Sequence, residues 1–500
     1  MISKLKKKVT LLNTVSTFLL QIVLILDGFI IPKLILDAFG SDVNGLTSSL
    51  NQFLSYIALV EGGITGVIIA RLYKPLAKKN NKKLSAILVS ANRFYRKIGY
   101  FFIIYALFLS IIYPVIFNTG FNFLYVSSLT LILSIYFIVQ YMLSLTYKTL
   151  LVADKKIYIV SFTQVVIRIA EIVFAIIAVK IYPNIHLLKL ITGLVFILQP
   201  IIYTRYIKKN YHIDKSVRAD DSLIKGRWSG FAINTAAFIH NSTDVIVLTV
   251  FTNLATVSVY SVYALVVSGL KNVINSLVSS LNPTLGHAYA LRDFKNLNQK
   301  LDLYEYIIFM LVFLIFGVTG LLITPFVMIY TAGLTDANYS QPIFGIFLVV
   351  AEALYLLKFP HLNLAYSADR FKEISKPAFV EAGLNIIISI CLVPFLGLIG
   401  VAIGTFIAML YRLIFHVYYT SKMVPGRNQW IFYRKLLIFI IATILGILVC
   451  SLIPITSATI LSWIICAIIY FIVLGTMFSV VSIMFFREEL KILKAYLIKR

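Results

Sequence analysis

Long apolar runs separated by short polar segments make up most of the 500-residue chain. A helix that spans a membrane needs about 20 apolar residues, and the sequence holds about 14 such runs. A β-barrel would instead show short segments of alternating polarity. The pattern therefore predicts an all-α integral membrane protein, with spans near residues 11–36, 45–70, 98–117, 123–147, 157–179, 186–204, 229–251, 257–286, 303–330, 342–365, 377–395, 397–420, 434–452 and 457–484.

The composition excludes a soluble globule and a disordered chain. Sixty per cent of the residues are hydrophobic and 13% are charged. In soluble domains about 45–50% of the residues are apolar and about 25% are charged. The three cysteines, Cys391, Cys450 and Cys466, all fall in apolar runs. Their spacing fits neither a disulfide framework nor a metal site. The sequence thus gives no sign of a metal or other cofactor.

Basic residues follow the alternation of the loops. Lys and Arg number 45 in all, and 38 of them lie at the start of the chain and in seven alternate segments. Cytoplasmic loops carry such an excess, so we expect both termini in the cytoplasm and an even number of spans. The net charge of +25 then reflects membrane topology rather than a nucleic-acid surface. The apolar run after the basic N-terminus is too long for a signal peptide and is interpreted as a retained first span. The segments are 71–97, 148–156, 205–227, 292–300, 370–376, 422–435 and 487–500.

An internal repeat suggests two halves. A shift of 217 residues carries Asp27 onto Asp244 and a basic loop near Lys78 onto one near Lys295. Halves in the same orientation are typical of transporters with a two-fold axis along the membrane normal, and the substrate then lies between them. We expect a six-helix lobe at 1–205, a cytoplasmic linker at 206–227, a second six-helix lobe at 228–421, and two further spans with a tail at 422–500.

Two basic segments have an amphipathic pattern. In 82–97, apolar residues such as Leu84, Ile87 and Leu88 share one side, and in 487–500 Leu490, Leu493 and Leu497 do the same. Such helices can lie in the headgroup layer. The alternative is a solvated basic loop that serves only topology.

Ionisable side chains inside the apolar runs are the candidates for function, because each needs a partner, a hydrated cavity or a role in transport. We select Asp27, Glu61, Arg168, Glu171, Asp244, Lys271, Glu352, Lys358 and Arg412, together with His240 and His361.

Their spacing separates paired from unpaired groups. Arg168 and Glu171 are three apart and can pair on one helix face. Arg412 and Lys358 lie toward one end of their spans, where a long side chain can reach the interface. Lys271 lies deep inside its span, so it lines a cavity or pairs with Asp244 or Glu61.

Three further features point to a transport pathway. Residues 240–244 form the most polar stretch within any span, and they include His240 and Asn241. Glu61 precedes Gly62 and Gly63, which allow a bend. Asp27 and Asp244 are repeat-related acids that can bind a proton or Na⁺, or can neutralise a nearby cation. Since no phosphate-binding loop, nucleophile elbow or paired-histidine motif occurs, we expect no enzyme activity.

Several segments resemble bacterial Wzx-type oligosaccharide flippases, in the superfamily that also holds the MATE exporters and lipid II flippases. They are Val43–Leu46, Arg71–Ala77, Thr243–Leu248, Val257–Tyr260, Asn385–Ile388 and Gly397–Thr405. The resemblance implies two lobes around a cavity, alternating access, and transfer of an undecaprenyl-pyrophosphate-linked oligosaccharide to the outer leaflet of the bacterial plasma membrane. It also implies glycosyltransferases and a glycan polymerase as working partners.

The resemblance also suggests roles for the selected residues. The expected substrate cavity comprises Lys271, Arg168, Glu61, Asn241 and His240, and the expected coupling residues for H⁺ or Na⁺ are Asp244, Asp27 and Glu352. The alternative is a MATE-like, cation-coupled exporter of small molecules, for which the intramembrane acids leave room. A membrane-embedded sugar-transfer enzyme is a weaker alternative, because no sizeable outer loop is present.

Overall fold

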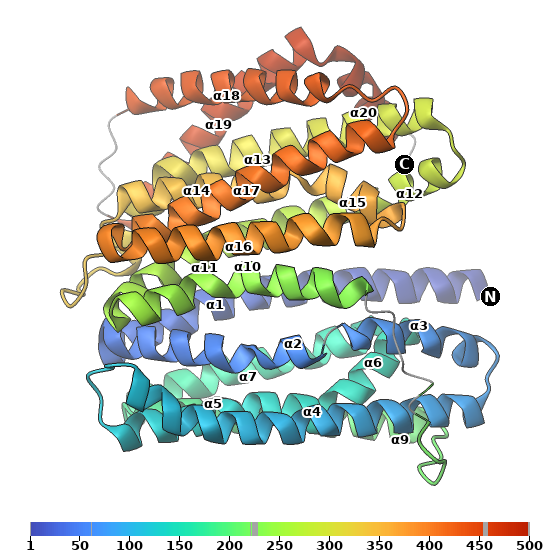
Figure 1. The fold of residues 1–500 in the computed structure, drawn as a ribbon, viewed down its shortest axis with the longest axis vertical. Coiled ribbons are helices and arrows are strands. Elements are labelled where there is room, and N and C mark those ends of the chain that lie inside the picture. Colours follow the sequence, from blue (N-terminus) through green and yellow to red (C-terminus); the bar gives the residue numbers. More distant parts are fainter. Residues whose placement is uncertain (1, 62, 221, 223–228, 454–458, 499–500) are drawn as a thin grey trace. The chain divides into compact units, whose positions relative to one another are not determined.

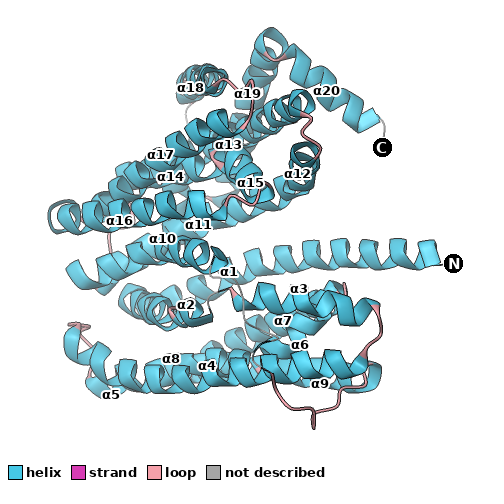
Figure 2. Ribbon diagram, turned by 45° about the vertical axis from the view of Figure 1, so that its right-hand side comes forward, coloured by secondary structure: helices cyan, strands magenta, loops and turns pink. Residues whose placement is uncertain are grey.

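The computed structural model describes residues 2–61, 63–220, 222, 229–453 and 459–498. Within these ranges the regular secondary structure is entirely helical (Figures 1 and 2). The chain forms two compact units, Met1–Phe238 with Asn253–Ser258 and Ile239–Thr252 with Val259–Arg500, here called the first and second unit. The predicted all-α membrane class is confirmed.

Helices up to α9 belong to the first unit. They are α1 (Ile2–Ser55), α2 (Ile57–Glu61), α3 (Ile64–Ala77), α4 (Asn81–Ile116), α5 (Phe123–Val139), the π-helical turn η1 (Gln140–Ser144), α6 (Leu145–Ala153), α7 (Ile157–Ile181), α8 (Ile185–Phe196) and α9 (Leu198–Asn210).

The remaining helices lie wholly in the second unit, except α10 and α11, which lie mainly in it. They are α10 (Ser229–Phe251), α11 (Leu254–Val278), the 3₁₀ turn η3 (Ser279–Leu281), α12 (Asn282–Ala290), α13 (Phe294–Tyr330), α14 (Pro342–Leu357), α15 (Phe359–Ser367), α16 (Phe371–Leu396), α17 (Leu398–Met423), α18 (Gln429–Ser451), α19 (Ile460–Phe485) and α20 (Arg487–Ile498).

The number of membrane spans agrees with the hydrophobic pattern. Twelve helices in the described ranges are long and apolar enough to cross a membrane. The first of them contains a kink at Gly40, whose φ of 80° is not helical. A straight helix of 54 residues would be about 80 Å long, which is more than twice the thickness of the hydrocarbon core of a membrane. Helix α1 therefore supplies two spans. With α10, of which Ser242–Phe251 is the apolar part, the total reaches the predicted 14.

Helix order repeats between the halves. Adding 217 to the residue numbers of α4, α5 and α7 gives ranges that match α13, α14 and α16 to within four residues. The packing partners repeat as well: α5 contacts α4 and α8, and α14 contacts α13 and α17. The breaks also correspond, since the interruption between α2 and α3 falls on η3 after the shift. These observations support two six-helix repeats followed by α18 and α19.

Helix α9 extends into the segment 206–227 that is predicted to be a linker. Helix α9 continues to Asn210, five residues past the expected end of the first lobe at 205. The chain then leaves the helix, and the backbone N–H of Asp214 donates to Ser85 Oγ at 3.0 Å. The N–H of Asp220 donates to Ser90 Oγ at 2.9 Å. The first part of the linker is therefore attached to α4, while the limits of the four segments stay a prediction.

One amphipathic segment does not lie where the pattern suggested. Residues 82–97 are the first half of α4, which begins at Asn81 rather than near 98. Leu84, Ile87 and Leu88 are buried in the hydrophobic core of the first unit. The expectation of a headgroup-layer helix is wrong for this face, because the apolar residues pack inside the protein. The C-terminal segment forms α20, which contacts α13 and α19; the side chain of Leu497 lies outside the described residues.

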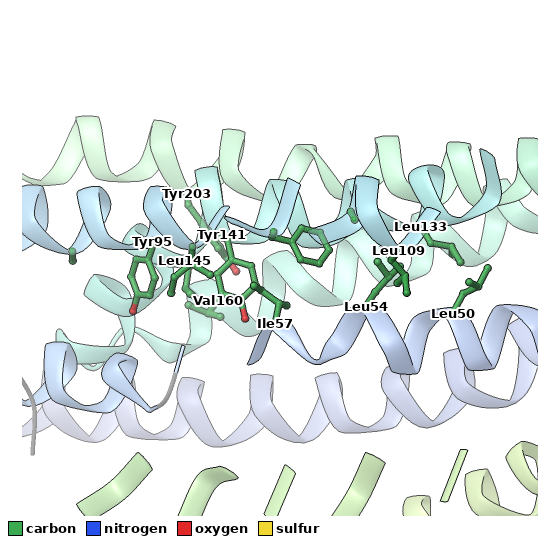
Figure 3. Packing of buried hydrophobic residues seen from close by; sticks show 14 of the residues in the cluster. Leu50, Leu54, Ile57, Tyr95, Leu109, Leu133, Tyr141, Leu145, Val160 and Tyr203 are labelled. Carbon is green, nitrogen blue, oxygen red and sulfur yellow. The ribbon is translucent and has the colours of Figure 1, made fainter. Parts of the chain in front are cut away.

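The core of the first unit combines aliphatic side chains with tyrosines, some of which bond their hydroxyls to neighbouring groups. Figure 3 shows Leu50, Leu54 and Leu109 among the packed residues. Buried Tyr113 donates to Ser49 Oγ at 2.7 Å. Since a buried hydroxyl without a partner is costly, such bonds let aromatic rings fill the core without loss.

Close helix packing in the second unit depends on small residues. Gly400 and Gly404 are four apart on α17 and face α16. A Cβ at Gly400 would come within 2.7 Å of the carbonyl carbon of Leu392 and 2.8 Å of the nitrogen of Val393. Small residues at this spacing let two membrane helices approach closely.

We predict that Gly400→Ala destabilises the protein by about 1–3 kcal/mol, because the new methyl group meets backbone that cannot rotate away. Thermal unfolding in detergent measures the effect. Gly383→Ala on α16 is the control, since nothing lies within 4 Å of its Cβ position. Equal unfolding temperatures for the two variants would contradict the close contact.

Candidate functional site

Asp244 of α10 is held by neutral donors. Its Oδ2 atom accepts a hydrogen bond from the Tyr260 hydroxyl of α11 at 2.8 Å and one from the Thr405 hydroxyl of α17 at 3.1 Å. Thr405 in turn accepts from Asn385 Nδ2 of α16 at 3.0 Å. The residue is only 5% exposed. Among the described side chains, no Lys, Arg or His forms an ion pair with Asp244.

Lys271 of α11 pairs with Glu352 of α14. The Nζ atom lies 2.9 Å from one carboxylate oxygen and 3.0 Å from the other. The same ammonium lies 4.8 Å from the centroid of the Tyr355 ring. The predicted alternatives, Asp244 or Glu61 as the partner of Lys271, are wrong, because the α11 face that carries Lys271 turns toward α14. Glu352, expected to be a coupling residue, is thus the partner of Lys271.

Lys358 and Arg412 are buried rather than extended to an interface. The Nζ atom of Lys358, the residue that follows α14, lies 4.0 Å from the centroid of the Tyr355 ring. It is 2% exposed. Arg412 Nη1 donates to Glu381 at 2.6 Å, and its Nε donates to the His416 ring at 2.8 Å. The expectation that both side chains snorkel is wrong, because carboxylate, imidazole and aromatic partners are available inside the unit.

The first unit has its own charged cluster. Arg168 and Glu171 of α7 form the predicted pair, with Nη1 and Oε2 2.8 Å apart. The same guanidinium nitrogen lies 3.5 Å from Asp27 Oδ2 of α1. The Tyr136 ring of α5 lies 5.9 Å from the guanidinium carbon. Lys189 of α8 interacts electrostatically with both acids.

The two repeat-related acids therefore have different surroundings. Asp27 has the Arg168 guanidinium beside it, whereas the described groups that donate hydrogen bonds to Asp244 are neutral. The 217-residue shift carries Arg168 onto Asn385, so an amide replaces the cation at the equivalent position. Oxygen-rich surroundings without a competing cation suit a proton or a hard cation such as Na⁺.

Glu61 lies at a helix break. It ends α2, and Gly63 adopts a left-handed φ of 74° before α3 begins. The predicted bend is thus present. The carboxylate accepts from Tyr141 of η1 at 3.1 Å and also bonds Thr65. Both contacts belong to the first unit, and they connect the break to the π-helical turn.

Some predicted residues fall outside the clusters. The side chains of His240 and Asn241 lie outside the described residues, so their contacts stay a prediction. His361 does not join the clusters above; its Nε2 lies 3.3 Å from Glu305 of α13. In the described part of the chain, no group of His, Cys, Asp and Glu side chains has the arrangement of a metal site.

A buried ionic network that joins α13 to α18 and to the loop before α18 was not identified from the sequence. Glu305 bonds both Arg427 and Lys435, and Asp302 lies 2.9 Å from Arg427 and 2.7 Å from Lys435. Burial by itself lowers the pKa of Arg427, but the two carboxylates outweigh it and raise that pKa. Glu305 and Glu381 each stand inside an apolar run, which was the available signal. Arg427 stands in a loop and gave none.

We predict that Arg168→Met lowers stability by about 3–5 kcal/mol, because it leaves two buried carboxylates beside each other without their cation. Asp27→Asn is the matched control, since the Arg168–Glu171 pair survives. Thermal unfolding and the amount of folded protein in the membrane provide the readouts. If the two variants unfold at the same temperature, Arg168 is not what neutralises this cluster.

No family model matches the sequence, and no curated protein matches it. Solved structures do match. The lipid II flippase MurJ in its inward closed conformation is similar with a TM-score of 0.71 and 16% identity, over 94% of this chain and 98% of that one. An inward-facing MATE multidrug resistance transporter of the MOP superfamily is similar with a TM-score of 0.60 and 12% identity, over 82% of this chain and 96% of that one.

The MATE transporter VcmN of Vibrio cholerae is also similar, with a TM-score of 0.57 and 14% identity over 85% of this chain and 99% of that one. At such identities the likeness concerns the fold alone. The chain has the fold shared by MurJ and the MATE transporters of the MOP superfamily.

Proposed function

We propose that the protein is a flippase that moves an undecaprenyl-pyrophosphate-linked oligosaccharide from the cytoplasmic to the outer leaflet of a bacterial plasma membrane by alternating access. The observation that carries this proposal is the fold match to a lipid II flippase over 94% of the chain. The Wzx-like segments and the repeated six-helix halves add support. On this account both termini face the cytoplasm, the chain performs no chemical conversion, and glycosyltransferases and a glycan polymerase work beside it.

Asp244 is the residue that we assign to cation coupling. A carboxylate that already neutralises an arginine gains little from a proton or Na⁺, whereas one held by hydroxyl groups has a free charge to offer. Asp27 is in the first situation and Asp244 in the second. The coupling role expected of Asp244, Asp27 and Glu352 therefore narrows to Asp244 in this proposal, because Asp27 lies beside Arg168 and Glu352 pairs with Lys271.

Lys271 remains the candidate for binding the pyrophosphate, although it is paired with Glu352. An ion pair that is 13% exposed on each side is accessible enough to open when an anion replaces the carboxylate. Arg168 and Glu61 are the members of the proposed substrate-binding set in the first unit. His240 and Asn241 complete the proposed set on the second.

A cation-coupled exporter of small molecules is the second candidate. The MATE transporters share the fold with TM-scores of 0.60 and 0.57, and an intramembrane carboxylate serves either substrate class. Transport of a lipid-linked glycan against transport of a small organic cation in the same vesicles distinguishes the two.

For the purified protein in vesicles, we predict that an imposed proton or Na⁺ gradient accelerates glycan flipping. Asp244→Asn should reduce the rate to that seen without a gradient, because the amide keeps the hydrogen bonds but cannot take up a cation. Asp27→Asn should keep the response to the gradient. Flipping that ignores both gradients in the wild type would leave passive, product-driven transfer as the better account.

For Lys271, we predict that Lys271→Met and Glu352→Gln each lower the amount of folded protein, since each leaves one buried charge without its partner, at a cost of about 3–5 kcal/mol. The double variant should regain folded protein but not glycan transport. Normal transport by the folded double variant would show that Lys271 only neutralises Glu352 and binds no anion.

A further inference from the structure

A cleft of about 600 Å³ opens in the first unit, and none of the charged residues described above lines it. Helices α4 and α9 and the segment η1–α6 form its walls, and Ile213 and Lys215 of the linker close one side. A second cleft of about 650 Å³ shares Lys208, Ile213 and Lys215 with it. Figure 2 shows the linker as a loop beside α9. The two clefts are therefore neighbours around one short stretch of linker.

Four cations line the first of these clefts, and no carboxylate does. They are Arg96 of α4, Arg205 and Lys208 of α9, and Lys215 of the linker. All four are exposed, and none forms an ion pair with any described residue. Four positive charges around one space repel one another, so the cleft favours an anion.

The opposite wall is apolar. Leu88 and Val89 of α4, Met142 and Leu143 of η1, and Ile197 and Ile201 beside them contribute to it. Leu143 and Ile201 are 49% and 44% exposed, on spans that face lipid when the protein is in a membrane. A cleft that is cationic on one side and apolar on the other fits an amphiphile better than a free anion.

Local backbone features shape this wall. The π-helical turn η1 directs Met142 and Leu143 into the cleft, and such turns are frequent at functional sites. Gly99 leaves the room, because a Cβ there would come within 2.5 Å of Met142 Cγ. Gln199 Nε2 donates to Ser144 Oγ at 2.8 Å and joins the start of α9 to η1.

The linker is held over the cleft by its own contacts. The bonds from Asp214 and Asp220 to α4 fix the chain on both sides of Lys215. The hydroxyl of Tyr211, four residues before Lys215, donates to Asp154 at 2.5 Å and accepts from Lys156 Nζ at 3.0 Å. Lys215 is therefore placed at the cleft by the fold.

The depth of the cleft also fits a lipid headgroup. Lys208 lies in the last turn of α9, and the linker follows directly. Basic pockets between membrane helices at this level bind anionic headgroups. The apolar wall then continues toward the membrane core along α9 and η1.

We propose that this cleft binds an anionic membrane phospholipid, whose headgroup phosphate contacts Arg96, Arg205, Lys208 and Lys215 and whose acyl chains follow α9 and η1. The bound lipid connects the linker to α4 and α9. This site is separate from the proposed transport pathway, and its test measures binding rather than transport.

The experiment uses the full-length protein in a non-ionic detergent with added phosphatidylglycerol, phosphatidylcholine or inorganic phosphate. We expect phosphatidylglycerol to raise the unfolding temperature and the other two to have little effect. Arg205→Gln with Lys208→Gln should weaken phosphatidylglycerol binding about tenfold or more, since each cation near an anionic headgroup contributes appreciably.

The matched control removes two cations of the same region that do not line this cleft, Lys209→Gln with Arg218→Gln. It should bind like the wild type. Arg205→Lys with Lys208→Arg keeps the charge and should also keep the binding, which separates loss of the site from loss of folding. Equal weakening in the control, an equal response to inorganic phosphate, or no response to phosphatidylglycerol would each overturn the proposal.

Discussion

An ionised side chain inside a membrane protein must find its partner within the protein, because the hydrocarbon core offers no water. This constraint organises the clusters of both units. Lys271 and Glu352 join α11 to α14, and Arg412 and Glu381 join α17 to α16. Each pair fixes the rotation of two helices about their axes, because a turn of either helix would separate the charges. The charges thus specify how apolar helices, which could otherwise slide and rotate, pack together.

The same constraint draws attention to Asp244, which, like Glu61, is bonded to neutral groups. Asp244 accepts hydrogen bonds from neutral groups and forms no ion pair with any described side chain, whereas Asp27 lies beside Arg168. Two halves that descend from one repeat pattern have therefore diverged at the position where each carries an acid. In a transporter, a difference of this kind lets one half respond to a cation while the other half serves as a fixed frame. The helix break at Glu61 and the π-helical turn at Tyr141 lie in the first unit and bond each other, so even that frame contains a non-helical element.

Much of the fold could be predicted from the sequence, and less of the site. The spans, the repeat and the Arg168–Glu171 pair depend on composition and on spacing along one helix, which the sequence contains directly. The partner of Lys271 depends on how α11 rotates against α14, which is set by packing across the unit. The same holds for Arg412, whose acid stands 31 positions away. Residues 82–97 show the converse error: their amphipathic pattern was correct, but an amphipathic helix has the same pattern whether lipid or protein covers its apolar face.

The central claim is that Asp244, and not Asp27, takes up the coupling cation. Infrared spectroscopy of the purified protein tests it most directly, because a protonated carboxyl group has a carbonyl stretching band that a carboxylate lacks. The account predicts a band that grows on acidification, shrinks when Na⁺ is added, disappears in Asp244→Asn and persists in Asp27→Asn. A band that persists in Asp244→Asn and disappears in Asp27→Asn would contradict it.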